Sequence, residues 1–485
     1  MGVRLFLFLL VLILCVSVVS AGFAAVEYQK FPVNKEVDGR AEVIIIGAGI
    51  SGLTAALELK HKGVDVLLLE KEPQVGGRMR SVIFDGIACN IGVAWVNADF
   101  SSPVDSYIKR FPLQPLGGNM IAWEGKVIEI KGSLLDSVPF SEEAKKDFSA
   151  CLEKMRKDAA VLFPGVDFNK QKNWDYVYDL PTDTALWKKL EKQTIREYLA
   201  QYHPDVTTLW GTRVRGGFGG SPDNVSALFL IGWYRGSPFF PMTIIKGGNN
   251  LLPEEMSKEY MKAGGRLALN SEVTEISQDG KAVYIHCRDG KVYSSDYAVV
   301  TMPANTAKEI IKGLSPRKYR ALAAVQYVPL VGIAIHLKNF PAGDKFSGIM
   351  FFKCGNSAAF MSQSGAVAGY PEAGAVISVA VTDEKKFNLP DDLLLAAIYE
   401  DIRMISPNFD PGKDILGCAV MRWPIGEVHM SPGFLSKYGE ALKESAGRVY
   451  FGGEYASNFP TWGGGVWAGK KAAKEILGEM QRSRK

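Results

Sequence analysis

The sequence predicts an α/β fold, in which strand–turn–helix segments from both ends of the chain build one domain and an α+β domain is interleaved between them. Two observations carry this prediction. Residues 43–80 have the pattern of a buried strand, a glycine-rich turn, a helix and a second strand. Residues 448–477 have the pattern of a strand, a Gly-Gly-acid turn, a glycine-rich linker and a helix. Such alternation is typical of a sheet covered by helices.

The first glycine-rich turn has the spacing of a dinucleotide-binding site. The apolar run Val43–Ile46 reads as a strand buried on both faces. It ends at three glycines in the pattern G-x-G-x-x-G, namely Gly47, Gly49 and Gly52. In this pattern the first glycine permits a tight turn, the second lets a pyrophosphate approach the backbone, and the third lets the next helix pack against the strand. The turn predicts a Rossmann-like unit with the pyrophosphate at a helix N-terminus.

The second strand, residues 64–69, ends in an acid. Glu70 and Lys71 follow it directly. A carboxylate about twenty residues after the glycines accepts hydrogen bonds from the hydroxyls of an adenosine ribose. A basic residue at position 70 would instead indicate a 2′-phosphate.

The next segment indicates which dinucleotide is bound. Gly76 and Gly77 can present successive backbone N–H groups to an anion, and Arg78 adds a positive charge to the same diphosphate. With Ser81, these residues resemble the GG-R-x-x-S signature of the superfamily of flavin-containing amine oxidases, protoporphyrinogen oxidases and phytoene desaturases. The resemblance implies a Rossmann-like FAD-binding domain of the GR2 type with an interleaved α+β substrate-binding domain.

Later segments extend the resemblance along the chain. Residues 247–252 are similar to the superfamily's GG-x-x-x-L, and the resemblance assigns adenine contact to Val273. It places Glu454 near the ribityl and diphosphate region, and a helix opened by Gly465 and Val466 at the pyrimidine end of the flavin. The residues expected to bind FAD are Gly47, Gly49, Ile50, Ser51, Gly52, Glu70, Lys71, Gly76, Gly77, Arg78, Val273, Glu454, Gly465 and Val466.

The resemblance also divides the chain. The expected ranges are 1–25 for a signal peptide or N-terminal anchor, 41–98, 241–303 and 422–480 for the FAD-binding domain, and 99–240 and 304–421 for the substrate-binding domain. Apolar spacing and capping residues predict helices from Ser141 and over 194–202, 226–234 and 391–405. Strands are predicted over 267–276, 297–303, 325–337, 348–352 and 375–381, and a hairpin that turns at Asp289-Gly290 is predicted over 282–292. The glycine-rich residues 215–220 follow no strand, so they predict a flexible connection.

The sequence contains no clear motif for the residues that contact the substrate. The catalytic residues are not identified, and the candidates to line the flavin are Trp423, Trp462 and His429, although buried tryptophans are more often core residues. In amine-oxidising members of the superfamily a lysine holds a water near flavin N5. Our alignment places Val331 or Gly332 there, which argues against simple amine oxidation.

Three functions follow from the resemblance. The first is an FAD-dependent oxidoreductase that takes a hydride from an amine or an apolar unsaturated small molecule and passes electrons to an acceptor that the sequence does not identify. The second is a polyene or tetrapyrrole desaturase or isomerase. The third is a flavin-binding partner protein without turnover. The cysteine that anchors flavin covalently in some relatives has no counterpart in residues 425–432, so the resemblance implies non-covalent FAD.

Composition excludes several alternatives and suggests a location. The 485 residues are 47% hydrophobic and 22% charged with a net charge of +4, so nucleic acid is not an expected partner. The six cysteines and five histidines show no metal-ligand spacing. Arg4 precedes an apolar run that ends in small residues before Gly22, the pattern of a secretory signal. Uncleaved, this run would serve as a membrane anchor, so the protein is expected to be exported (periplasmic or secreted) or membrane-anchored.

Overall fold

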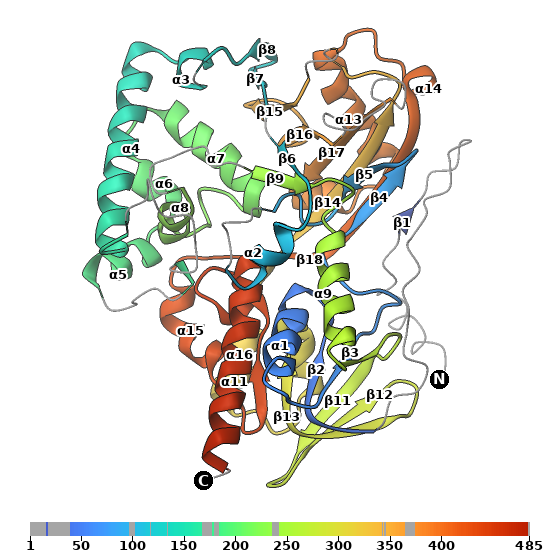
Figure 1. The fold of residues 1–485 in the computed structure, drawn as a ribbon. Coiled ribbons are helices and arrows are strands. Elements are labelled where there is room, and N and C mark those ends of the chain that lie inside the picture. Colours follow the sequence, from blue (N-terminus) through green and yellow to red (C-terminus); the bar gives the residue numbers. More distant parts are fainter. Residues whose placement is uncertain are drawn as a thin grey trace, which may run out of the picture.

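The computed structural model places two sheets and the helices around them (Figure 1). It describes residues 16–17, 39–96, 102–116, 118–132, 134–166, 177–178, 184–234, 242–341, 343, 346–363 and 374–483. Apart from the two-residue strand β1 (Val16–Ser17), the predicted leader over residues 1–25 lies outside these ranges. Within them, no helix combines the length and the apolar character needed to cross a membrane.

One sheet joins strands from the start, the middle and the end of the chain. Its seven strands are β2 (Arg40–Ile46), β3 (Val66–Leu69), β10 (Arg266–Ala268), β11 (Val273–Gln278), β12 (Val283–Cys287), β13 (Val292–Val300) and β19 (Val449–Phe451). Their order is β10-β3-β2-β13-β12-β11, with β19 also paired to β13. The pairs of β2 with β3 and β13 are parallel, and the strand interior is apolar on both faces, as expected for a parallel sheet covered by helices.

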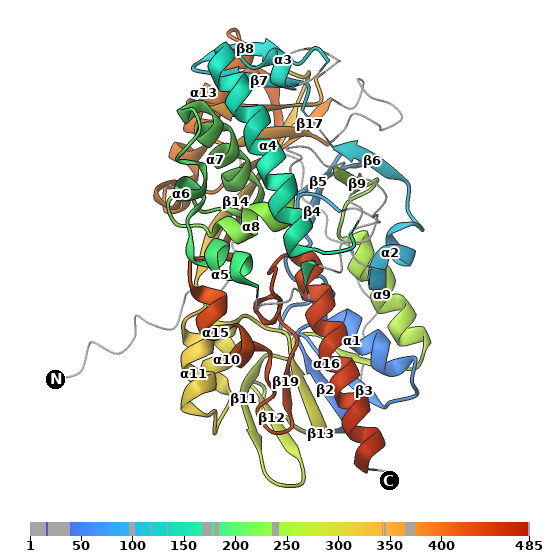
Figure 2. The same cartoon turned by 90° about the vertical axis from the view of Figure 1, so that its left-hand side faces the viewer.

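Helices pack on this sheet and against one another. They are α1 (Ile50–Lys60), α2 (Ser102–Ile108), α9 (Leu251–Lys262), α10 (Ala304–Ile310), α11 (Pro316–Ala323), α15 (Phe434–Lys443) and α16 (Trp462–Ser483), with the short 3₁₀ helix η2 (Glu454–Ala456). Helices α1 and α16 lie side by side in both ribbon views (Figures 1 and 2). A Cβ on Gly469 would lie 2.3 Å from the backbone oxygen of Ser51, so only glycine permits this approach. The two ends of the chain are thereby joined next to the first glycine-rich turn.

The second sheet has eight strands and shares none of them with the first sheet. Its strands, in sheet order, are β1, β18 (Ile415–Val428), β14 (Tyr327–Leu337), β17 (Ala375–Val381), β16 (Ala359–Ser362), β15 (Gly348–Phe352), β7 (Met120–Trp123) and β8 (Lys126–Glu129). Helix α13 (Asp391–Ile405) packs against one face of this sheet through buried apolar residues. The short helices α12 (Glu384–Phe387) and α14 (Pro411–Asp414) come before and after α13 in the chain. Two hairpin-like pairs, β4 (Ser81–Phe84) with β5 (Ile87–Asn90) and β6 (Leu113–Leu116) with β9 (Met242–Ile245), lie between the two sheets (Figure 1).

A helical group covers the remaining side. It consists of α3 (Leu134–Ser137), α4 (Glu142–Leu162), α5 (Ala185–Lys192), α6 (Ile195–Leu199), α7 (Pro204–Phe218) and α8 (Ala227–Tyr234). Its core is aromatic: Phe148 stacks on Trp210 with ring centroids 6.2 Å apart. As predicted, Ser141 caps α4, because its hydroxyl accepts a hydrogen bond from the Ala144 N–H at 3.1 Å.

Several predicted elements are confirmed, and three predictions are wrong. The bounds predicted for α13, β15 and β17 agree with the structure. The predicted strand over 267–276 is two strands, because Asn270 between them has a left-handed φ of 54° and its N–H donates to Glu72 O at 3.2 Å. The predicted flexible connection over 215–220 is mostly the last turn of α7.

The third error is the absence of β18 from the prediction. Pro424 removes a backbone donor inside it, and the register with β14 shifts around that position, so the segment lacks a plain strand pattern. The expected boundary between residues 421 and 422 falls inside this strand. The division into the six ranges remains a prediction.

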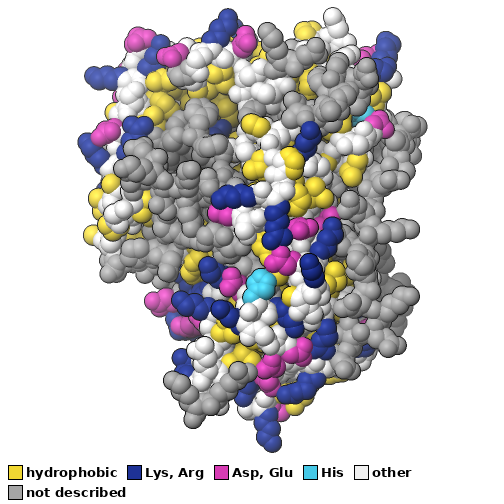
Figure 3. Space-filling view, viewed as in Figure 1, with side chains coloured by type: hydrophobic (Ala, Val, Ile, Leu, Met, Phe, Trp, Pro, Cys, Tyr) yellow, Lys and Arg dark blue, Asp and Glu magenta, His cyan; other side chains and the backbone are white. Residues whose placement is uncertain are grey.

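Surface charge is mixed. On the face shown in Figure 3, Lys and Arg side chains are interspersed with Asp and Glu side chains among the described residues. Among the described residues, partly exposed charges also pair with one another, for example Arg110 with Glu255 at 3.2 Å. Such pairs weaken the local field of each charge.

Candidate active site

The first glycine-rich turn leads from β2 into α1. A Cβ on Gly52 would lie 1.8 Å from the backbone oxygen of Gly47, so the third glycine is required for helix α1 to start this close to the turn. The Thr301 hydroxyl, at the end of β13, donates to Ile46 O at 2.8 Å and supports the turn from the neighbouring strand. Ile50 and Ser51 form the first turn of α1. The backbone N–H groups at this N-terminus can therefore bind an anion.

Glu70 lies beside this turn, at the end of β3. Its side chain is buried, and its two carboxylate oxygens accept hydrogen bonds from the N–H of Ala48 at 2.7 Å and of Glu72 at 2.9 Å. Burial raises the pKa of Glu70, which the two backbone donors oppose. Each carboxylate oxygen retains a lone pair for a ligand hydroxyl. The carboxylate is thus held beside the first glycine turn with acceptor capacity for a ligand hydroxyl.

Lys71 and Val273, both expected to bind FAD, have different surroundings. Lys71 is exposed and pairs with Glu72 at 3.4 Å, so it points to solvent. Val273 begins β11. The segment just before Val273 runs alongside Glu70, since Ser271 N–H donates to Glu70 O at 2.8 Å. Val273 therefore lies two residues beyond a contact with the Glu70 backbone, whereas the Lys71 side chain is exposed.

A second glycine turn faces the first. Gly76 N–H donates to Ala48 O at 2.8 Å, and Gly49 and Gly76 form a parallel bridge. A Cβ on Gly77 would lie 3.4 Å from Gly49 Cα, inside the space between the turns. Gly76 and Gly77 both have positive φ, 108° and 55°, the conformation that turns backbone N–H groups toward a common point. The residues present therefore fit the diphosphate of a dinucleotide.

Arg78 follows the second turn and meets residues from the other end of the chain. Its guanidinium lies 2.8 Å from the carboxylate of Glu454 and donates to Gly426 O in β18. Burial by itself would lower the pKa of Arg78. The nearby carboxyl groups of Glu454 and Glu427 have the larger combined effect, so the pKa of Arg78 is raised. The Arg78 side chain is 32% exposed, so part of the guanidinium remains open to a ligand.

The start of α16 completes this group. Gly464 N–H and Gly465 N–H donate to the side chain and backbone oxygens of Thr461, at 3.3 Å and 2.9 Å. A Cβ on Gly465 would lie 3.6 Å from the Cβ of Ser51, so the first turns of α1 and α16 touch. Val466 is fully buried beneath them. The predicted Gly465 and Val466 are therefore brought next to the first glycine turn.

The three candidate flavin-lining residues are separated. Trp423 is 7% exposed and its indole N–H donates to Ile91 O at 2.7 Å, which places it in the core between β18 and β5. Trp462 is the first residue of α16 and is partly buried between two core clusters. His429 follows β18, and neither ring nitrogen has a hydrogen-bond partner in the part of the chain that the structure describes. Burial lowers the pKa of His429, which favours neutral imidazole.

One of the two positions aligned with the amine-oxidase lysine, Gly332, has no room for a side chain. A Cβ on Gly332 would lie 2.1 Å from the backbone oxygen of Ile91. The neighbouring Val331 is buried on the opposite face of β14, against α13. The segment after β5 therefore occupies the space in which a lysine at residue 332 would lie.

Sequence reasoning missed part of this site. Glu427 and Tyr327 lie close enough to Arg78 to influence its charge, yet no local motif marks them. An aromatic cluster also went unrecognised: Phe229 stacks on Phe459 at 5.0 Å and on Trp233 at 6.3 Å, and Trp233 meets Trp95 at 5.6 Å. Within the described ranges, no group of three or more His, Cys, Asp or Glu residues is arranged to hold a metal ion.

Residues 50–477 match the model of the family described as flavin containing amine oxidoreductase. The chain belongs to this family. It is an FAD-dependent oxidoreductase of the amine oxidase superfamily, an enzyme that acts on a small molecule, and its α/β fold combines a Rossmann-like FAD-binding part with a substrate-binding part.

Curated relatives resemble the chain over most of its length. Polyamine oxidase 6 of Oryza sativa subsp. japonica is 27% identical over 86% of this chain and 86% of its own. Nicotine dehydrogenase of Pseudomonas putida is 23% identical over 90% and 88%. Phytoene desaturase (neurosporene-forming) of Rhodobacter capsulatus is 25% identical over 58% and 56%.

Solved structures share the fold. A triple mutant of putrescine oxidase superposes with a TM-score of 0.74 at 18% identity, covering 91% of this chain and 99% of the other. Cyclohexylamine oxidase from Brevibacterium oxydans gives a TM-score of 0.69 at 19% identity over 91% and 99%.

Proposed function

We propose that the protein oxidises a small amine, by hydride transfer from a C–H bond next to nitrogen to bound FAD. Support comes from the relatives that match across most of the chain, which include polyamine oxidases, a nicotine dehydrogenase and L-amino acid oxidases. FAD supplies the hydride acceptor, and the protein supplies binding and orientation.

The observation that carries this proposal is the meeting of both chain ends at the glycine turns. We assign Glu70 to the ribose and Arg78, which pairs with Glu454, to the diphosphate. The aromatic cluster around Phe459 lies just before the start of α16 in the chain, and we infer that it forms an apolar side of the substrate site. A neutral His429 could accept a proton from an ammonium substrate, as unprotonated amine is the form that gives up hydride.

A second candidate function is desaturation or isomerisation of a polyene or a tetrapyrrole. The blocked position at Gly332 favours it, because the lysine expected of amine oxidation cannot be accommodated there. The similarity to a phytoene desaturase covers a smaller part of the chain, so we rank this function second.

The remaining assignments belong to the same proposal. We infer non-covalent FAD, because residues 425–432 contain no cysteine. The apolar leader suggests export, or membrane association through an uncleaved anchor. The electron acceptor is left open.

Anaerobic flavin reduction tests the proposal. The purified holoprotein is mixed with polyamines, cyclic amines, amino acids, a carotenoid and a reduced tetrapyrrole, and the flavin absorbance is followed. Bleaching by an amine alone supports the first function, and bleaching by the polyene or tetrapyrrole alone supports the second. Bound flavin that no compound and no artificial acceptor can cycle would indicate a partner protein without turnover. Release of the flavin on denaturation checks that it is not covalently attached.

A further inference from the structure

Glu427 is a carboxyl group without a fixed partner at the cofactor site. It lies on β18 opposite Val328 of β14 and follows Gly426, whose backbone oxygen accepts a hydrogen bond from Arg78. The side chain is half-buried. Among the described residues, its carboxyl group makes no hydrogen bond and no ion pair, although Arg78 and Glu454 are both near enough to act on its charge.

The groups around Glu427 leave an excess of negative charge. Arg78 is the cation of the cluster and already pairs with Glu454 at 2.8 Å. Tyr327, on the neighbouring strand, accepts a hydrogen bond from Ala304 N–H at 2.8 Å, and burial raises its pKa, so it stays neutral. His429, which follows the end of β18 two residues after Glu427, is neutral at alkaline pH. One guanidinium therefore faces two carboxyl groups.

Burial and the Glu454 carboxylate raise the pKa of Glu427 to about 8, against the opposing effect of Arg78. In the protein without cofactor, Glu427 therefore loses its proton as the pH rises through this value. A diphosphate next to Arg78 would add further negative charge to a site that already has too much. Two interacting acids that share one cation cannot both ionise without a cost, and an added anion increases that cost.

We propose that Glu427 is a positioning residue of the FAD site that keeps its proton when the diphosphate lies beside Arg78, so that FAD binding in alkaline solution takes up one proton. The neutral carboxyl group relieves the repulsion and gains an O–H that can donate a hydrogen bond. The proposal rests on the cofactor site of the proposed function, but it does not depend on which substrate is oxidised.

Linkage gives the sign of the effect. Below the pH at which Glu427 ionises in the apoprotein, both the apoprotein and the FAD complex carry the proton on Glu427. In that range Glu427 causes no change of FAD affinity with pH. Above it, the proton must be taken from solution, so the dissociation constant of FAD rises by up to about tenfold per pH unit.

The test is a titration of the full-length apoprotein with FAD between about pH 6.5 and about pH 9.5, followed by flavin fluorescence. The wild-type dissociation constant is expected to be flat at low pH and to rise above about pH 8. In Glu427→Gln, which is neutral at every pH, the rise is expected to disappear. Glu440→Gln is the matched control, because that side chain is 87% exposed and its charged neighbour is Arg317, which is not part of the Arg78 cluster. Equal slopes in wild type and Glu427→Gln, or a flat wild-type curve, would overturn the proposal.

A second measurement covers a variant that folds poorly. Proton uptake on adding FAD to the wild-type apoprotein is measured with a pH indicator in weak buffer near about pH 9, where it should approach one proton per flavin and vanish near about pH 6.5. No uptake at the alkaline pH would contradict the proposal. Neither experiment uses a substrate, so a protein that shows the proton linkage but oxidises no amine would refute the proposed function alone.

Discussion

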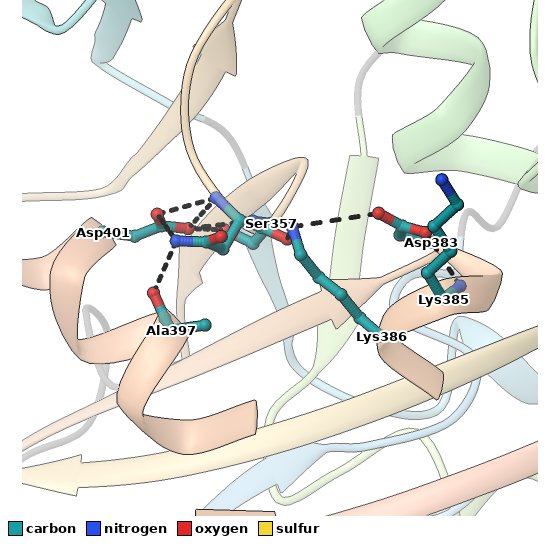
Figure 4. Close-up of polar contacts among 7 residues, drawn as sticks. Ser357, Asp383, Lys385, Lys386, Ala397 and Asp401 are labelled. Atoms are coloured by element: carbon teal, nitrogen blue, oxygen red, sulfur yellow. Dashed lines mark hydrogen bonds and ion pairs between the residues drawn. The ribbon is translucent and has the colours of Figure 1, made fainter. Parts of the chain in front are cut away.

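Two buried acid clusters in this molecule differ in how their charge is balanced. In the first, on the outer face of the second sheet, Asp401 of α13 is 1% exposed and accepts five hydrogen bonds from the loop between β15 and β16. The donors are the backbone and side chains of Asn356 and Ser357, at 2.7 to 3.1 Å (Figure 4). Lys386 adds a bond to Asn356 O at 3.0 Å and lies 3.9 Å from Asp383. Every charge there has a local partner.

The second cluster, Arg78 with Glu454 and Glu427, is not balanced by its neighbours. Its single cation is shared between two acids, and the adjacent Gly76 and Gly77 both have positive φ. The comparison teaches a general distinction. A buried acid that accepts several hydrogen bonds from the protein serves stability, whereas a group of charges that the protein leaves uneven is typical of a binding site.

The largest expected effect is at the balanced cluster. Asp401→Ala leaves several buried donors without acceptors, so it should lower the unfolding free energy by about 4 kcal/mol. Thermal unfolding followed by calorimetry should show a clear fall in Tm, while the protein that remains folded binds FAD normally. Asp401→Asn, which keeps an acceptor oxygen, is expected to lose less. An unchanged Tm in Asp401→Ala would show that the loop does not depend on these bonds.

At the unbalanced cluster, the expected loss is in cofactor binding. Arg78→Met removes the cation that faces the diphosphate and leaves Glu454 without its partner, so FAD affinity should fall by about 3 kcal/mol, or more than a hundredfold. Titration of apoprotein with FAD measures this. Arg78→Lys keeps the charge without the planar fork and should lie between wild type and Arg78→Met. Equal affinity in all three proteins would remove Arg78 from the cofactor site.

A smaller loss is expected at the other end of the same site. Glu70→Ala should weaken FAD retention by about 2 kcal/mol, through lost ribose hydrogen bonds and a freed Ala48 N–H. Flavin content after gel filtration, compared with Glu70→Gln, measures the effect. Unchanged flavin content in Glu70→Ala would count against the ribose assignment.

The smallest effect is expected where charges are paired in water. Arg196 and Asp223 form a bidentate pair with both side chains more than half exposed. Asp223→Asn should change stability by less than about 0.5 kcal/mol and leave FAD binding intact. A larger fall in Tm would mean that exposed pairs matter here as much as the buried clusters do.

Local patterns were sufficient for much of the cofactor site. Gly47, Gly49 and Gly52 are recognisable because a tight turn and a close helix each require glycine at a set spacing. The acid at the end of β3 is recognisable because it follows the turn at a set distance, and Glu70 indeed lies beside Ala48. Helix α13 and strand β17 were also predicted with the right bounds, because an unbroken apolar pattern is likewise a local property of the sequence.

The sequence by itself therefore determined the fold class, the cofactor family and the strand and helix that carry the first glycine turn, because each depends on residues close together in the chain. Only the tertiary structure decided that Gly332 is blocked by Ile91 and that Glu427 approaches Arg78. Arg78 and Gly426, which join these regions, are 348 residues apart. Such contacts depend on how two sheets pack, and packing distance has no periodic signature in the sequence.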